Sequence, residues 1–101
     1  MDNLTIETEK NQETLNVKLG GRLESSTSPK LEEELKKNLE GIVDLRFDFA
    51  KLEYLSSAGL RVLLSASKIM KKQGTMEIRN VNEEVMEVFI ITGFANILTI
   101  L

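Results

Sequence analysis

The sequence predicts an α/β fold: one domain over residues 1–101, with a small mixed β-sheet and helices packed mainly on one of its faces. Three observations predict it. Two stretches near the N-terminus alternate apolar and polar side chains, and residues 43–49 alternate clearly enough to leave one face in water. Segments of helical periodicity separate the later strands, so those strands are predicted to be parallel. The predicted order is β-β-α-β-α-β-α, with a short final strand over residues 96–101 left open.

The first two strands are predicted to form an antiparallel hairpin. Residues 4–8 alternate between the two faces of a half-buried strand. The next stretch alternates in the same way, with apolar side chains at Leu15, Val17 and Leu19. Residues 10–12 between them have the composition of a turn, and Gly20 and Gly21 are predicted to end the hairpin.

The first helix is predicted to begin at Ser28-Pro29. Ser28 can cap the helix, and Pro29 fits the first helical position, where a missing N–H costs nothing. The apolar side chains then recur every four residues, at Leu31, Leu35 and Leu39. This stripe is typical of a helix packed on a core, and Gly41 is predicted to stop the helix.

The central strand and the helix after it have the clearest patterns. The strand over residues 43–49 is predicted to bury Val43, Leu45, Phe47 and Phe49. After a loop, residues 57–72 have helical periodicity, and their polar stripe consists of Arg61, Ser65, Lys68 and Lys72. The other positions of this helix are mostly apolar, so it is predicted to be largely buried, and Gln73-Gly74 ends it.

The last part of the chain predicts a strand and a third helix. Residues 75–79 are typical of a strand, and Asn82 can cap the helix that follows it, with two glutamates in the first turn. The side chains predicted to face the core are Val85, Val88 and Phe89. Gly93 is predicted to end this helix.

Composition excludes several classes of function. There is no cysteine and no histidine, so the chain has no disulfide, no zinc–cysteine site and no Ser-His-Asp triad. The net charge is −3, with basic residues scattered among acidic ones, unlike a nucleic-acid-binding surface. Gly-x-Ser-x-Gly and Gly-x-x-x-x-Gly-Lys patterns are also absent. We therefore expect no enzyme, and no cofactor, metal or direct nucleic-acid contact.

Neither a membrane span nor a secretory signal is indicated. The sequence has no run of 18 apolar residues, and MDNLTIETEK at the N-terminus lacks the basic and apolar regions of a signal peptide. We therefore expect a cytoplasmic protein. The sequence does not indicate an oligomeric state.

The most informative segment is residues 47–64, FDFAKLEYLSSAGLRVLL, in which a strand leads through a short loop into the predicted buried helix. It resembles the signature of the STAS family, named for sulphate transporters and anti-sigma factor antagonists. The matching positions are Asp48 at the strand aspartate, Tyr54-Leu55 at the hydrophobic pair, Ser57 at the phosphorylatable serine, and Gly59-Leu60 at the closing pair. The order of elements agrees over nearly the whole chain.

A second segment carries the same resemblance. Gly21-Arg22-Leu23-Glu24, followed by Thr27, is similar to the family's Gly-x-Leu-Asp…Thr loop, which lies near the phosphorylated serine and helps to bind the partner. The resemblance implies a phosphorylatable anti-sigma factor antagonist. Its partners would be an anti-sigma factor with serine kinase activity and a serine phosphatase. The implied partner-binding residues are Glu24, Ser25, Thr27, Ser56, Ser57, Ala58, Gly59 and Leu60.

The segment departs from the family pattern at three positions. Ser56 stands in place of the usual aspartate, Ala58 in place of serine or threonine, and Glu24 in place of the aspartate of the first loop. Ser56 is therefore a second candidate for phosphorylation. A serine at a helix N-terminus lies among unpaired backbone N–H groups, which favour a phosphate. Phosphorylation at Ser57 would thus leave the fold intact and change the surface.

Simpler interpretations of these residues remain open. Ser56 and Ser57 can be helix caps, of which Ser56 is the better candidate, and Gly59 can serve close packing alone. Asp48 can belong to the solvated face of its strand, and Glu24 can be a solvated loop charge. The alternative function is a STAS scaffold, or a regulatory subunit of a signalling assembly or transporter, that has no phosphoswitch.

Overall fold

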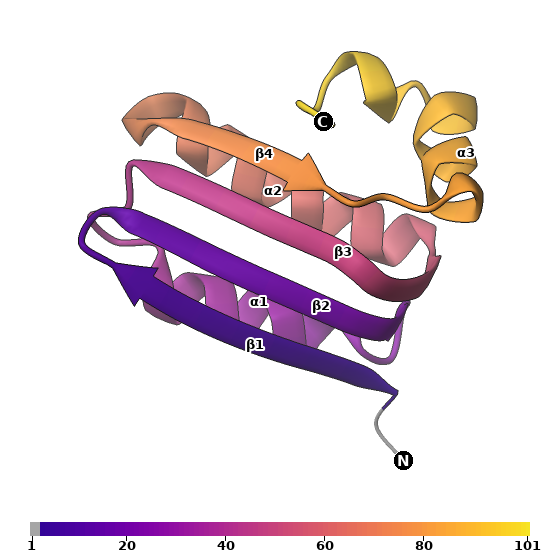
Figure 1. The fold of residues 1–101 in the computed structure, drawn as a ribbon, viewed down its shortest axis with the longest axis horizontal. Helices are drawn as coiled ribbons and strands as arrows, with labels where there is room; N and C mark the ends of the chain where they lie inside the picture. Colours follow the sequence, from indigo (N-terminus) through magenta and orange to yellow (C-terminus); the bar gives the residue numbers. More distant parts are fainter. Residues whose placement is uncertain (1–2) are drawn as a thin grey trace.

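The computed structural model describes residues 3–101 and contains a four-stranded sheet with the spatial order β1-β2-β3-β4 (Figure 1). The strands are β1 (Leu4–Asn11), β2 (Thr14–Leu23), β3 (Asp44–Leu55) and β4 (Thr75–Arg79). The helices are α1 (Ser28–Asn38), α2 (Ser57–Gln73) and α3 (Glu83–Thr92), and a short 3₁₀ helix, η1, covers Phe94–Asn96. β1 and β2 are antiparallel, whereas β2, β3 and β4 run parallel, so the mixed sheet predicted from the sequence is confirmed.

The hairpin is longer than predicted at both ends. β1 continues through Lys10 to Asn11, and the chain turns at Gln12, which has a φ of 58°. Gly20 and Gly21 do not end the hairpin, because β2 continues through them to Leu23. Gly21 has a φ of +88°, and a Cβ there would lie 1.9 Å from the carbonyl oxygen of Asn3, so both the conformation and the close approach require glycine.

β3 is also longer than the predicted strand over residues 43–49. Its buried side chains are Leu45, Phe47, Phe49, Leu52 and Leu55, so their spacing changes from two residues to three after Phe49. The register with β2 shifts at two points, and at each of them β3 carries one additional residue, as in a β-bulge. The predicted loop between strand and helix is therefore reduced to Ser56. At the other end of β3, Val43 precedes the strand and is 43% exposed, and Ile42 is buried instead.

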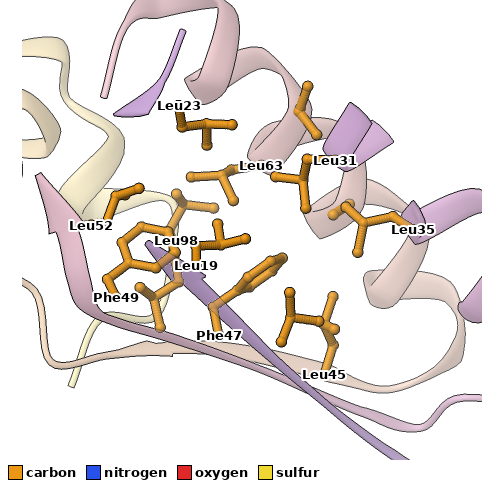
Figure 2. Close-up of a cluster of buried hydrophobic side chains, with 14 of the residues drawn as sticks. Leu19, Leu23, Leu31, Leu35, Leu45, Phe47, Phe49, Leu52, Leu63 and Leu98 are labelled. Atoms are coloured by element: carbon orange, nitrogen blue, oxygen red, sulfur yellow. The ribbon is translucent and has the colours of Figure 1, made fainter. Parts of the chain in front are cut away.

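The core lies between one face of the sheet and the helices. Figure 1 shows α1 and α2 together behind the sheet. In Figure 2, Leu63 of α2 lies between Leu23 of β2 and Leu31 of α1. Helix α3 contributes Phe89, whose ring stacks on that of Phe49 with 6.4 Å between centroids. The opposite face of the sheet carries exposed charged side chains such as those of Lys18, Arg46 and Arg79, so the helices cover mainly one face, as predicted.

The helix ends confirm some predictions and correct others. Ser28 does not cap α1: the cap position is Thr27, and the Ser28 hydroxyl donates to the backbone carbonyl of Glu24 at 2.6 Å. Gly41 lies beyond the end of α1 at Asn38, although its φ of +79° does suit glycine. By contrast, Asn82 accepts a hydrogen bond from the Val85 N–H at 2.8 Å and caps α3 as predicted.

Two further features concern the burial of α2 and the C-terminal segment, where the sequence leaves a final strand open. Helix α2 has the predicted polar stripe but is less buried than predicted, because Ile69 is 42% exposed and Leu64 is only partly buried. Residues 96–101 form no regular strand: a single parallel bridge joins Ile100 to Ile78 at the outer edge of β4. The Ile78 N–H donates to the Thr99 carbonyl and the Leu101 N–H to the Ile78 carbonyl, each at 2.9 Å.

Leu63 and Ile69 provide a matched test of this packing, since both are large aliphatic side chains on α2. Leu63 is fully buried, so Leu63→Ala should lower the free energy of unfolding by about 2–5 kcal/mol. Ile69→Ala should cost about 1 kcal/mol or less, because much of that side chain is already in water. Urea denaturation of both variants measures the difference, and equal losses would contradict the one-sided burial of α2.

Candidate functional site

The predicted site forms at the carboxyl ends of the parallel strands β2 and β3. Leu23 and Leu55, the last residues of the two strands, are paired in the sheet. One residue further, the Ser56 N–H donates to the Leu23 carbonyl at 3.0 Å. The loop from Glu24 to Thr27 and the start of α2 therefore leave the sheet side by side. This edge is where parallel sheets commonly place their binding sites.

Ser57 is the first residue of α2, and its side chain is exposed. It lies on the solvent side of the helix, together with Arg61 one turn later. The backbone N–H groups of this first turn have no partner within the helix. An added phosphate would therefore face solvent and unpaired N–H donors, with no need to displace core side chains.

Ser56 occupies the cap position of α2, but its side chain does not cap the helix. Its carbonyl accepts the hydrogen bond from the Leu60 N–H at 3.0 Å. Its hydroxyl makes no hydrogen bond to the first-turn N–H groups. The Ser56 Oγ is itself buried and has no hydrogen-bond partner among residues 3–101. The two neighbouring serines thus differ, since only Ser57 presents its hydroxyl to solvent.

Gly59 allows α2 to start directly against the end of the sheet. A Cβ at this position would lie 2.7 Å from Leu23 Cγ and 2.7 Å from Leu55 Cδ1, well inside ordinary contact distance. Leu60 is buried next to it. These two residues of the motif and Thr27 are buried and shape the site, whereas Ser25 and Ser57 are exposed and Glu24, Ser56 and Ala58 are partly exposed. The role of all eight residues in partner binding stays a prediction.

Hydrogen bonds fix the loop from Glu24 to Thr27. The Thr27 hydroxyl donates to the Arg22 carbonyl at 2.8 Å and accepts from the Glu24 N–H at 2.9 Å. The Glu24 carboxylate accepts hydrogen bonds from the backbone N–H of Ser26, at 2.7 Å, and from its hydroxyl. These bonds, with a smaller contribution from the Arg22 charge, hold the pKa of Glu24 below its ordinary value. Glu24 is therefore a fixed negative charge within the loop and not a freely moving one.

An aromatic–cation pair next to this loop was not predicted from the sequence. The Arg22 guanidinium lies 4.1 Å from the centroid of the Tyr54 ring, which is 42% exposed. Both residues line a shallow groove that also includes Glu53, Asn82, Glu83 and Glu84. Arg22 and Tyr54 are paired across β2 and β3, so the contact follows only once β3 is known to continue past residue 49.

Asp48 lies away from Ser57 and has a structural role. It pairs with Lys18 of β2, five residues before the paired strand ends at Leu23, which at strand geometry corresponds to about 17 Å. Its carboxylate accepts hydrogen bonds from the Asn80 side chain at 3.0 Å and from the Ala50 N–H at 2.9 Å. These two bonds lower the pKa of Asp48. The Ala50 bond lies at the first irregularity of β3, so Asp48 stabilises the bulge and belongs to the open face of the sheet.

Comparison with known proteins identifies the family. The family model described as "Mlab, STAS domain" matches residues 6–100. The chain belongs to the STAS domain family. Two curated relatives of this STAS domain are both named anti-sigma-B factor antagonist. The protein from Bacillus subtilis (strain 168) is 30% identical over 99 residues, covering 97% of this chain and 91% of the relative. The protein from Staphylococcus epidermidis is 33% identical over 98 residues, covering 95% and 91%.

Solved structures share the fold of this STAS domain. An anti-sigma factor antagonist from Mycobacterium paratuberculosis superposes with a TM-score of 0.87 at 19% identity, covering 96% of this chain and 84% of that one. The anti-sigma factor antagonist SpoIIAA in its unphosphorylated form gives 0.83 at 17% identity, covering 96% and 88%. These similarities establish the α/β architecture with an antiparallel β1–β2 pair followed by parallel strands.

The relatives also bear on the expectation that the chain is not an enzyme. The curated relatives are anti-sigma factor antagonists, a regulatory and non-enzymatic family, so this expectation is confirmed. Among residues 3–101, no helix is both long and apolar enough to cross a membrane.

The role of the Ser56 hydroxyl can be tested against a true cap. Ser56→Ala should change the free energy of unfolding by less than about 0.5 kcal/mol or stabilise the domain, because it removes a buried hydroxyl that has no partner. Asn82→Ala should cost at least about 1 kcal/mol, because it removes the cap of α3 and a 2.8 Å bond to the Leu52 carbonyl. Chemical denaturation compares the two, and a loss above about 1 kcal/mol for Ser56→Ala would show that this hydroxyl caps α2.

Proposed function

We propose that this chain, as a single STAS domain over residues 1–101, is an anti-sigma factor antagonist controlled by phosphorylation of Ser57. The unphosphorylated form binds a cytoplasmic anti-sigma factor that is also a serine kinase, and this binding frees a sigma factor. The kinase transfers the terminal phosphoryl group of ATP to the Ser57 hydroxyl, which loses its proton, and ADP leaves. The complex then dissociates, and a serine phosphatase restores the hydroxyl.

The observation that carries the proposal is the position of Ser57 at a partner-accessible strand–helix junction. Its side chain is exposed at the first position of α2, next to the loop from Glu24 to Thr27. The hydrogen bond between Ser56 and Leu23 holds the two segments together, so a partner can contact both at once. The names of the curated relatives support the same class of function.

The two serines of the motif are unequal as phosphate acceptors. A kinase must reach the hydroxyl oxygen, and the Ser56 Oγ is buried whereas the Ser57 side chain is exposed. Phosphate on Ser56 would also require a charged group to be accommodated where the hydroxyl is now enclosed, which is costly. Both arguments favour Ser57.

We therefore predict that Ser57 is the main phosphorylated residue after reaction with the cognate kinase and ATP. Mass spectrometry of the peptides from the reacted protein measures the site directly. Ser57→Ala should abolish phosphorylation, whereas Ser56→Ala should retain it. Phosphate found chiefly on Ser56, or on the exposed loop serines Ser25 and Ser26, would contradict the assignment.

Charge explains how the phosphate could end binding. A phosphate adds about −1.5 to −2 charges to a surface that already carries the fixed Glu24 carboxylate. A partner surface that fits a neutral hydroxyl would have to desolvate this group or face it with its own charges. The fold itself tolerates the change, because a negative charge at the N-terminus of α2 is favourable by about 0.3–1 kcal/mol.

The corresponding prediction is that Ser57→Asp weakens binding to the cognate anti-sigma factor at least about tenfold, which corresponds to about 1.4 kcal/mol. Ser57→Ala should bind well and resist inactivation by kinase and ATP. Ser65→Asp is the matched control: it adds the same charge to the exposed side of α2, two turns further on, and should bind like the wild type. Isothermal titration calorimetry, after a folding check by circular dichroism, measures all three.

The same experiment separates the alternative function. If Ser57→Asp and Ser57→Ala bind the anti-sigma factor with equal affinity, the phosphoswitch is wrong and a constitutive STAS scaffold accounts better for the chain. If Ser57→Asp and Ser65→Asp weaken binding equally, the effect is one of general charge and the junction at Ser57 is not the contact point.

A further inference from the structure

The exposed side of α2 places a cation one helical turn after Ser57. On one side of this helix, exposed polar side chains follow one another at spacings of three or four residues: Ser57, Arg61, Ser65, Lys68 and Lys72. Positions four apart bring their Cβ atoms to about 5–6 Å. Helical side chains lean toward the N-terminus, so Arg61 extends in the direction of Ser57.

Arg61 forms no ion pair with an acidic side chain within the described part of the chain. Ion pairs within residues 3–101 involve Lys37, Arg46 and Arg79, and none of these pairs involves Arg61. Helix α2 contains no aspartate or glutamate, so no acidic residue on the same helix competes for Arg61. On the neighbouring α1, Glu32 lines the groove between the two helices together with Val62 and Ser65, and among residues 3–101 it forms no ion pair with Arg61.

The other cation near the site is already engaged. Arg22 lies over the Tyr54 ring and beside the Glu24 carboxylate, whose pKa it helps to lower. Arg61 is exposed and shares a helix face with Ser57.

We propose that Arg61 is the internal counter-ion of a phosphate on Ser57. This inference rests on the proposed function and names the residue that would hold its phosphorylated state. The planar guanidinium can donate two parallel hydrogen bonds to phosphate oxygens, and the unpaired N–H groups of the first turn of α2 add further donors. The phosphate would then lie along α2 as a stabilised dianion and not project freely toward solvent.

The test uses the full chain with phosphoserine introduced at position 57 during translation, so no kinase is needed. The ³¹P chemical shift of the phosphate, followed against pH at physiological ionic strength, gives the midpoint of its second ionisation. A nearby cation favours the dianion, so Arg61→Gln should move the midpoint upward by about 0.3 pH or more. Lys68→Gln is the matched control: it removes the same charge about 16 Å along the helix, beyond the Debye length.

Each outcome decides the proposal. An upward shift in Arg61→Gln with a wild-type midpoint in Lys68→Gln supports it. A wild-type midpoint in Arg61→Gln overturns it, as do equal shifts in both variants. A shift in Arg22→Gln without one in Arg61→Gln overturns it in favour of Arg22. Because phosphoserine is built in, failure of this pairing is distinguishable from failure of the phosphoswitch, which is measured by binding of Ser57→Asp and Ser57→Ala.

Discussion

The parallel pairing of β2 with β3 extends to the last residue of each strand, and the position of every site residue depends on it. Leu23 pairs with Leu55, and the Ser56 N–H then bonds to the Leu23 carbonyl at 3.0 Å. If β3 ended at Phe49, as its alternation suggests, six further residues would separate the sheet from Ser56. The loop from Glu24 to Thr27 and the start of α2 would then have no fixed relation. The pairing turns two distant sequence segments into one surface.

The two bulges explain both the success and the limits of sequence interpretation for this fold. Alternation with a period of two predicted the parts of the hairpin and of β3 that lie before the first irregularity. After Phe49 the buried residues are three apart, which resembles neither a regular strand nor a long helix, so the sequence pattern predicts a loop where β3 continues. Gly20 and Gly21 misled for a related reason. They are strand residues at which a side chain would collide with neighbouring atoms: a Cβ at Gly20 with Thr5 Oγ1, and a Cβ at Gly21 with the Asn3 carbonyl oxygen. Glycine weakens a strand interior, so the pair predicts an end of the strand.

The candidate site shows a similar division. The motif places Ser57 at a helix N-terminus, where it is exposed, and close packing is one of the two interpretations that the sequence leaves open for Gly59, because helix N-termini and glycine contacts depend on local sequence. The Arg22–Tyr54 pair and the enclosed Ser56 hydroxyl depend on strand register, which the sequence did not specify at that point. The same limit applies to Thr27 and Leu60: their motif positions are next to exposed residues, and only the structure shows that their own side chains are buried.

The unpaired Ser56 hydroxyl connects the local structure of α2 to its proposed regulation. An aspartate, which the family usually has at this position, could accept hydrogen bonds from the first-turn N–H groups and would place a negative charge beside Ser57. Ser56 does neither, since its Oγ is buried and forms no cap. The first-turn N–H groups of α2 therefore donate no hydrogen bond to the Ser56 hydroxyl, and the partial positive charge of this helix end can act on a group attached to Ser57. Arg61 lies one turn further on and adds a positive charge, so this helix N-terminus favours an anion more than a capped helix N-terminus would. In the proposed function, that anion is a phosphate on Ser57.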